Sequence, residues 1–375
     1  MPNLLSSRWH RPDPRLNPLA LAALVAATVV ATTTAQVQHV VVPAVYEQVD
    51  AISYQWIAGA SRPLRQQTLI GQSSLQALVG HSLTAIELRR SAKDETFYGG
   101  TADLTVTLSI APHGPLGVSR TYAANIGAAP QVVFAGPVQL PTSPPNTGPI
   151  VGWTPENVVR IEFATPFAYA GGTLCVDVVG TPIAGLNADW WMADAMFEDV
   201  IGTVTDLGGG CGTFGGPQHR WSHVATRTLV AGNYAEFFAY GTPWSLAVAA
   251  FGLGNPTGLP IHLLGLPSPG DCELHLATID GLIPTLMVPH SDPMLQSRGG
   301  LAHIELKLPG TPQALGMQMT TQWLEWQQLA TSNALQWTVC SALPTLDMAL
   351  VEGDPGEVDG QVSVHLAQVL RFEFE

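Results

Sequence analysis

The sequence carries little charge for its length. Only 12% of its 375 residues are charged, and Lys93 and Lys307 are its only lysines, whereas about 25% of the residues in an average soluble domain are charged. With 15 basic and 29 acidic residues, the formal net charge is −14. Nucleic acid is therefore not an expected partner, because its phosphates attract basic surfaces.

Common catalytic motifs are also missing. There is no GxSxG elbow for a serine nucleophile and no HExxH zinc motif. His219 and His223 lie four residues apart in "HRWSH", but the preceding Gly-Gly-Pro disfavours the helix that would bring them together. The sequence thus favours a non-catalytic protein, while an enzyme stays open.

The longest apolar run is too short to span a bilayer. Arg8, Arg11 and Arg15 precede "PLALAALVAATVVA" (18–31) and the small residues of "TTTAQ", an order typical of a secretory signal peptide. We expect residues 1–35 to be removed after Ala35, which changes the formal charge from −14 to −16 because three arginines and one aspartate leave. The alternative is a retained anchor, which needs about 20 apolar residues. We predict a secreted or cell-surface protein with no membrane span after signal removal.

Glycine and proline are abundant, and short alternating runs lie between them. The chain has 37 Gly and 30 Pro, and "LTVTLSI" (104–110) alternates apolar and polar residues as a half-buried strand does. Similar runs occur at 160–163, 174–178, 304–308, 316–323 and 361–366, with one short helical candidate around 94–97. This pattern predicts an all-β protein built from two antiparallel, jelly-roll-like β-sandwich domains.

Alternation stops before the glycine cluster near residue 208. We therefore expect an N-terminal sandwich over 37–206 and a C-terminal sandwich over 207–375. The acid-rich stretch "EGDPGEVDG" (352–360) is typical of a polar turn. We expect the tail after it, residues 361–375, to pair with the run at 346–351 inside the second sandwich.

The second half resembles a module found at the C-terminal end of exported proteins of planctomycete-type bacteria. The similar stretches include "GGGCGTFGGP", "GTPWSLAVAAFGL" (241–253), "GDCELHL" (270–276) and "TSNALQWTV" (331–339). The first half resembles the β-sandwich that commonly precedes that module, for example in "TPFAYAGGTLCVDV" (165–178). The resemblance implies export and a sandwich fold, and it implies no catalytic or binding residue.

The stretch "GGGCGTFGG" (208–216) does not fit a phosphate loop, because no Lys-Ser/Thr pair ends it and a proline follows. Cys211 and Cys272 both lie in turns rich in glycine or proline, so we expect a disulfide between them, with Cys175 and Cys340 as free buried thiols. The absence of a CxxC pair disfavours a zinc cluster built from cysteines.

The segment "ADWWMADAMFED" (188–199) offers the best candidate ligand site. Asp189, Trp190, Trp191 and Asp194, with Glu198 and Asp199 nearby, could form a platform for a sugar ring or for Ca²⁺. The alternative is that the tryptophans fill a junction between the domains and the acids are simply solvated.

Two functions from different classes remain. The first is an exported, non-catalytic structural or binding component of the cell surface or extracellular space, with a glycan or a cell-envelope protein as partner. The second is an extracellular carbohydrate-binding or carbohydrate-processing protein, a hydrolase, with a site built from loops near 188–199. No cofactor is expected, apart from Ca²⁺ in the case of the 188–199 site.

Overall fold

The structure is a computed structural model that describes residues 37–186, 188, 191–212, 223–225, 229–267, 271–289 and 299–375. The chain is all-β, as predicted, and every strand pair among these residues is antiparallel. All the elements below belong to one compact unit, Gln38–Glu375. The predicted signal peptide lies outside the described residues, and the jelly-roll connections and the division at residue 206 stay predictions.

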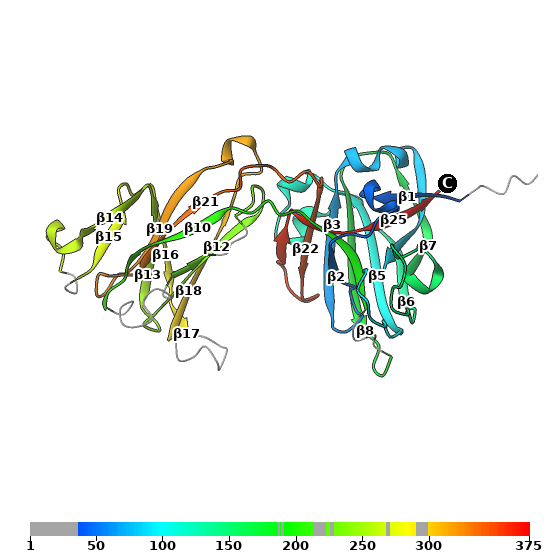
Figure 1. The fold of residues 1–375 in the computed structure, drawn as a ribbon, viewed down its shortest axis with the longest axis horizontal. Coiled ribbons are helices and arrows are strands. Elements are labelled where there is room, and N and C mark those ends of the chain that lie inside the picture. Colours follow the sequence, from blue (N-terminus) through cyan, green and yellow to red (C-terminus); the bar gives the residue numbers. More distant parts are fainter. Residues whose placement is uncertain are drawn as a thin grey trace, which may run out of the picture. The chain divides into compact units, whose positions relative to one another are not determined.

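Three sheets combine early strands with strands from the end of the chain (Figure 1). One has the order β1 (Gln38–Val42), β25 (Leu370–Phe374), β4 (His81–Arg89) and β7 (Val158–Tyr169). A second has the order β23 (Gln361–Ser363), β22 (Met348–Gly353), β3 (Leu64–Ile70), β8 (Leu174–Pro182), β5 (Gly100–Ile110) and β6 (Gln131–Leu140). A third has the order β2 (Ser53–Trp56), β9 (Met192–Phe197) and β24 (Leu366–Gln368).

The inner faces of the first two sheets share one hydrophobic core. Ile86 and Phe372 from one sheet, and Val106 and Val176 from the other, belong to the same buried cluster. Alternation at 104–110 and 174–178 placed Val106 and Val176 on a buried face correctly. At the end of β5 the alternation does not predict burial. The polar Ser109 is buried there, whereas the apolar Ile110 is 37% exposed.

The other three sheets come from the middle of the chain. The largest has the order β10 (Thr203–Gly209), β21 (Asn333–Thr338), β19 (Gln318–Glu325), β13 (Leu246–Gly252) and β16 (Gly281–Leu286), with β20 (Ala330–Thr331) paired to β19. Another has the order β11 (His223–Ala225), β12 (Tyr234–Gly241), β18 (Gly300–Lys307) and β17 (Val288–Pro289), and β14 (Gly254–Pro260) pairs with β15 (Glu273–Leu276). Phe237 and Ile304 pack with Trp323 and Trp337 in the core between the first two of these sheets.

Helices are short. The only α-helix among the described residues is α2 (Tyr122–Asn125), and the helix expected around 94–97 is absent because Phe97 forms a β-bridge with Ser143. The 3₁₀ helices of the same residues are η1 (Ala44–Glu47), η2 (Gln72–Leu78), η3 (Pro115–Gly117), η4 (Pro155–Asn157), η7 (Ile261–Leu264) and η9 (Pro312–Ala314).

The tail lies elsewhere than expected. β23 does pair with β22, which contains most of the run at 346–351, but β22 also pairs with β3 and β25 lies between β1 and β4. The placement in a C-terminal sandwich is therefore wrong. Alternation identifies a strand but not its neighbours, and here Phe372 and Phe374 complete the core of the sheets that hold the early strands.

The expected disulfide is confirmed. Cys211 and Cys272 are bonded with a Cα–Cα distance of 5.1 Å, and Cys175 and Cys340 are buried free thiols. Gly210 and Gly212, on either side of Cys211, have φ values of 103° and 54°, a region that glycine enters without steric cost. The glycines therefore let the backbone turn at the bridged cysteine.

Candidate functional site

The predicted platform at 188–199 is largely built into the protein interior. Trp191 is fully buried, its indole N–H donates to the Pro141 carbonyl at 2.8 Å, and its ring meets Phe97 edge-to-face at 5.7 Å. Trp191 therefore fills the core of the sheets that hold the early strands. Asp189 and Trp190 lie outside the described residues, so their part in a ligand site stays a prediction.

Asp194 is equally inaccessible. It is fully buried and its carboxylate lies 2.5 Å from Nη2 of Arg89, itself fully buried, while the Ala51 N–H donates to it at 3.1 Å. Burial raises the pKa of Asp194, although the Arg89 guanidinium opposes that shift. The arrangement is a buried ion pair with hydrogen-bonded partners, which ties β4 to β9.

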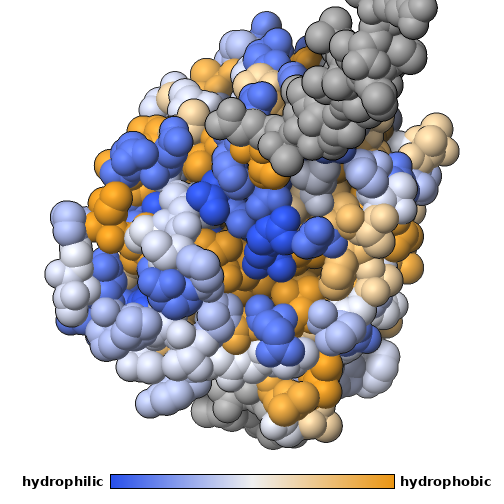
Figure 2. All heavy atoms as spheres, turned by 90° about the vertical axis from the view of Figure 1, so that its right-hand side faces the viewer, coloured by the Kyte–Doolittle hydropathy of each residue, from blue (hydrophilic) through white to orange (hydrophobic). Residues whose placement is uncertain are grey.

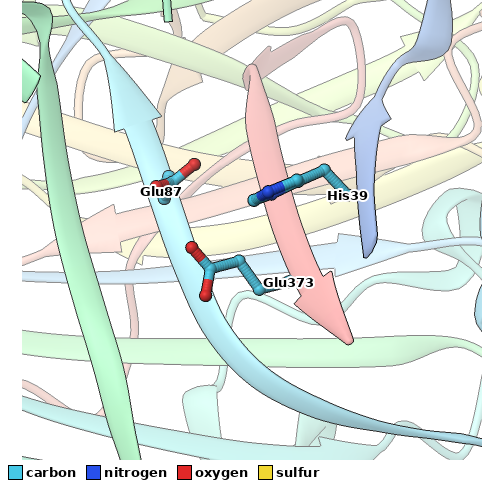
Figure 3. A group of neighbouring side chains, drawn as sticks. All are labelled: His39, Glu87 and Glu373. Atoms are coloured by element: carbon cyan, nitrogen blue, oxygen red, sulfur yellow. The ribbon is translucent and has the colours of Figure 1, made fainter. Parts of the chain in front are cut away.

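A cluster of one histidine and two glutamates lies on the polar face of the sheet β1-β25-β4-β7. His39 on β1, Glu373 on β25 and Glu87 on β4 point toward one another (Figure 3), and one ligand atom from each lies within 4.8 Å of the others. Figure 2 shows hydrophilic residues gathered in the middle of the face on the side of β7 in Figure 1. By composition alone this cluster could hold a metal ion.

Two arginines already neutralise this cluster. The guanidinium of Arg160 donates to both carboxylate oxygens of Glu373, at 2.8 and 2.7 Å, and Arg371 pairs with Oε2 of Glu87. Hydrogen bonding to Arg160 lowers the pKa of Glu373. The guanidinium of Arg371 also lies over the Trp153 ring at 4.6 Å. We call His39, Glu87 and Glu373 the arginine-paired cluster, because each of its two carboxylates has an arginine partner.

In a pocket of about 490 Å³, by contrast, carboxylates outnumber guanidiniums. Its lining includes six carboxylates and only two guanidiniums, those of Glu236, Glu305, Glu352, Asp354, Glu357, Asp359, Arg62 and Arg120. Four of the acids come from the stretch 352–360, which the sequence indicates only as a polar turn. We call this the acidic pocket.

The turn that supplies these acids is held in place by the segment before α2. Thr121 Oγ1 donates to Asp359 at 2.7 Å, and Gly360 N donates to the Arg120 carbonyl at 2.9 Å. Gly360 is required there, because a Cβ would lie 2.4 Å from the hydroxyl of Tyr122. The backbone of the acidic turn is thus fixed before any ligand arrives.

Three buried polar atoms at the pocket have no hydrogen-bond partner in the described part of the chain, and one of them, Nε of Arg120, is a donor. Asn233 lines the pocket, is 3% exposed and leaves its Oδ1 unpaired. The hydroxyl of Tyr122, behind the lining residues Gly353 and Gly360, is also unpaired, and burial raises its pKa to about 12. A buried amide oxygen without a donor is costly, and a cation in the pocket would satisfy it.

A second histidine and glutamate cluster borders this pocket. Glu236 on β12 pairs in register with Glu305 on β18, and His303 lies on the same face of β18. One ligand atom from each of the three lies within 4.8 Å of the others. We call Glu236, His303 and Glu305 the pocket cluster.

The functional residues that the sequence did not indicate are those of the acidic pocket. They come from segments near residues 62, 120, 235, 305 and 355, so no local motif links them. The signal available was the density of acids in "EGDPGEVDG". His219 lies outside the described residues, and nothing is described of the His223 side chain.

Comparison with protein families, curated proteins and solved structures finds no match for this chain. No helix in the described ranges is long and apolar enough to cross a membrane.

Proposed function

We propose that the protein is an exported, non-catalytic β-sandwich protein of the cell surface or extracellular space, and that its acidic pocket binds a positively charged ligand. The observation that carries this proposal is the pocket lining, in which six carboxylates face two guanidiniums. Such an excess of one sign raises the local concentration of oppositely charged ligands.

Two further observations support it. The unpaired Oδ1 of Asn233 is an acceptor that only a cation or a hydrogen-bond donor can satisfy. The disulfide between Cys211 and Cys272 is compatible with an oxidising compartment outside the cytoplasm, as the apolar run at 18–31 predicts.

The test is equilibrium binding of spermidine as a probe cation at low ionic strength. Asp354→Asn with Glu357→Gln removes two exposed carboxylates from the pocket, and roughly tenfold weaker binding is expected from two lost charges at short range. The control is Asp103→Asn with Asp280→Asn, which makes the same charge change at exposed positions that do not line the pocket. Equal affinity in the two double variants would contradict the proposal, and turnover on a panel of glycans, esters and peptides would show an enzyme.

The carbohydrate-binding alternative is favoured by a different pair of tryptophans from the one expected. Trp244 is 65% exposed and Trp326 is 57% exposed. Trp326 N donates to the Leu246 carbonyl at 2.9 Å, and Trp244 lies two residues before Leu246, so both tryptophans lie at the start of β13. Exposed indoles are suited to stacking against the apolar face of a sugar ring.

Trp244 also has a φ of 66°, which is rare for a bulky residue and marks a strained backbone conformation of the kind that also occurs at ligand sites. In a pull-down with insoluble cellulose and chitin, Trp244→Ala with Trp326→Ala should abolish retention if this alternative holds. Leu253→Ala, at another exposed apolar residue, is the control. No retention of the unchanged protein on either polymer would count against the alternative.

A further inference from the structure

We infer that the pocket cluster, Glu236, His303 and Glu305, binds a divalent d-block metal ion such as Zn²⁺. The two carboxylates and one imidazole come from paired positions on β12 and β18. Imidazole nitrogen and carboxylate oxygen together are ligands of this class of metal rather than of Ca²⁺, which takes oxygen alone.

The separations suit a metal with short bonds. His303 Nε2 lies 3.8 Å from Glu305 Oε1, and two ligands of a tetrahedral zinc ion are roughly 3.4 Å apart when each bond is about 2.1 Å. The third ligand atom lies within 4.8 Å of both. Side-chain rotations that move these ligand atoms by about 1 Å would bring all three within bonding distance of one zinc ion, with water as the fourth ligand.

His303 is held in the form and orientation that a metal needs. Its ring stacks on Phe238, with centroids 4.4 Å apart and planes 4° from parallel. Burial lowers the pKa of His303, with the Arg120 charge adding to that effect and Glu236 opposing it. The lowered pKa favours the neutral imidazole, which is the form that can donate a lone pair to a metal.

The charges around the cluster leave room for a cation. Arg120 pairs with Oε2 of Glu305, whereas Oε1 is the oxygen that faces His303. Lys307 lies two residues beyond Glu305, and its ammonium donates hydrogen bonds to the carbonyls of Val118 and Gly232. The neighbouring acids of the acidic pocket then add negative potential.

The buried Asn233 is an independent indication of a ligand on this side. Its Oδ1 has no donor among the described residues, and Asn233 lines the pocket together with Glu236 and Glu305. In the arginine-paired cluster, by contrast, both oxygens of Glu373 accept hydrogen bonds from Arg160. The two clusters have the same composition, so the arginine-paired cluster serves as a matched control for the pocket cluster.

This inference deepens the proposed function and rests on it, since Glu236 and Glu305 line the acidic pocket. His303 does not line it, so a His303 variant separates metal binding from the uptake of other cations. The experiment titrates ZnCl₂ into the purified full chain at pH 7.5 by calorimetry, after dialysis against a chelator, and repeats the titration with Co²⁺ to record its visible absorption.

The unchanged protein is expected to bind one ion that His303→Ala weakens at least about tenfold, as loss of a group that holds a metal generally does. His39→Ala should leave that affinity unchanged. Glu236→Gln is the second variant, in case His303→Ala does not fold, and circular dichroism verifies the fold of each. The inference is overturned if the unchanged protein binds no Zn²⁺, if His303→Ala and Glu236→Gln bind it as tightly as the unchanged protein, or if His39→Ala loses it.

The outcomes also separate the two proposals. His303→Ala that loses Zn²⁺ but still binds spermidine supports both. Zn²⁺ bound only through His303, together with spermidine binding that is indifferent to Asp354→Asn and Glu357→Gln, would overturn the pocket function and leave the metal site standing.

Discussion

The arginine-paired cluster and the pocket cluster contain the same three side-chain types on paired antiparallel strands, yet their electrostatics differ. In the first, Arg160 and Arg371 pair with both glutamates of the cluster, and Arg160 also pairs with Glu162. In the second, Arg120 is shared between Glu305 and Asp359, and further carboxylates line the neighbouring pocket. The comparison shows that the residues which neutralise a cluster, more than the cluster itself, decide whether it can take a ligand.

The two regions are also supported differently, and breaking the disulfide should have the largest effect. β12 and β18 place Phe237 and Ile304 in the same buried cluster as Cys211 and Cys272. The bridge joins cysteines 61 residues apart, and such a loop contributes about 4 kcal/mol through restriction of the unfolded chain. Cys211→Ser with Cys272→Ser should lower the free energy of unfolding by about that amount in urea titrations.

Non-reducing peptide mapping checks the pairing itself. Reducing agent should destabilise the unchanged protein and leave the double variant unaffected, because Cys175 and Cys340 are unbridged. A link from Cys211 to Cys340 would contradict the expected result.

The second-largest loss in the free energy of unfolding should come from removing the two arginines of the arginine-paired cluster. Arg160→Met with Arg371→Met leaves Glu87 and Glu373, 4% and 6% exposed, without counter-charges. A buried uncompensated charge costs several kcal/mol, and we expect a loss of about 3 kcal/mol at pH 7 because Arg160 is partly exposed. Urea unfolding measures it.

Arg120→Met is the matched change in the pocket cluster. It should cost about 1 kcal/mol or less, because its partners Glu305 and Asp359 keep contact with water at a pocket. Equal losses in the two regions would remove the distinction between the clusters.

The smallest effect is a two-step loss of stability in acid. Burial lowers the pKa of His303 below its ordinary value of 6.5, so below pH 6.5 the unfolded chain binds protons more readily than the folded protein and stability falls. Glu236, Glu305 and Arg120 are the charged groups that face this ring. The pKa of Glu373 is lowered from 4.5 by Arg160, so its contribution is present above pH 4.5 and is lost as the pH falls further.

Melting temperatures between pH 7.5 and 3 would resolve the steps. His303→Gln should flatten the step that begins near pH 6.5, with the remainder due to His365, whose pKa burial also lowers. Arg160→Met should instead weaken the step below pH 4.5. A His303→Gln profile that matches the unchanged protein would assign the first step to other groups.

Local features were predictable where one segment carries the whole signal. The alternation at 104–110 indicated β5, because half-buried strands need a two-residue period. The turns around Cys211 and Cys272 indicated the bridge, because glycines allow the positive φ values found beside Cys211. Both inferences depend on backbone geometry within a few residues.

The candidate ligand platform was judged from the composition of one segment, and composition does not determine exposure. Trp191 and Asp194 could equally serve a surface or a core, and their partners Pro141, Phe97 and Arg89 lie 50 to 105 residues away. The sequence around the exposed Trp244 and Trp326 did not distinguish them from the buried Trp191.

By itself the sequence determined the all-β class, several strand positions such as 104–110 and the paired cysteines, since hydrophobic period and turn chemistry are local properties. Only the tertiary structure decided that the tail strand β25 lies between β1 and β4, that two arginines reach Glu87 and Glu373, and that Arg120 is placed between Glu305 and Asp359. Strand neighbours and counter-charges come from segments far apart in the chain, and they are selected when the whole core and all its charges are satisfied together.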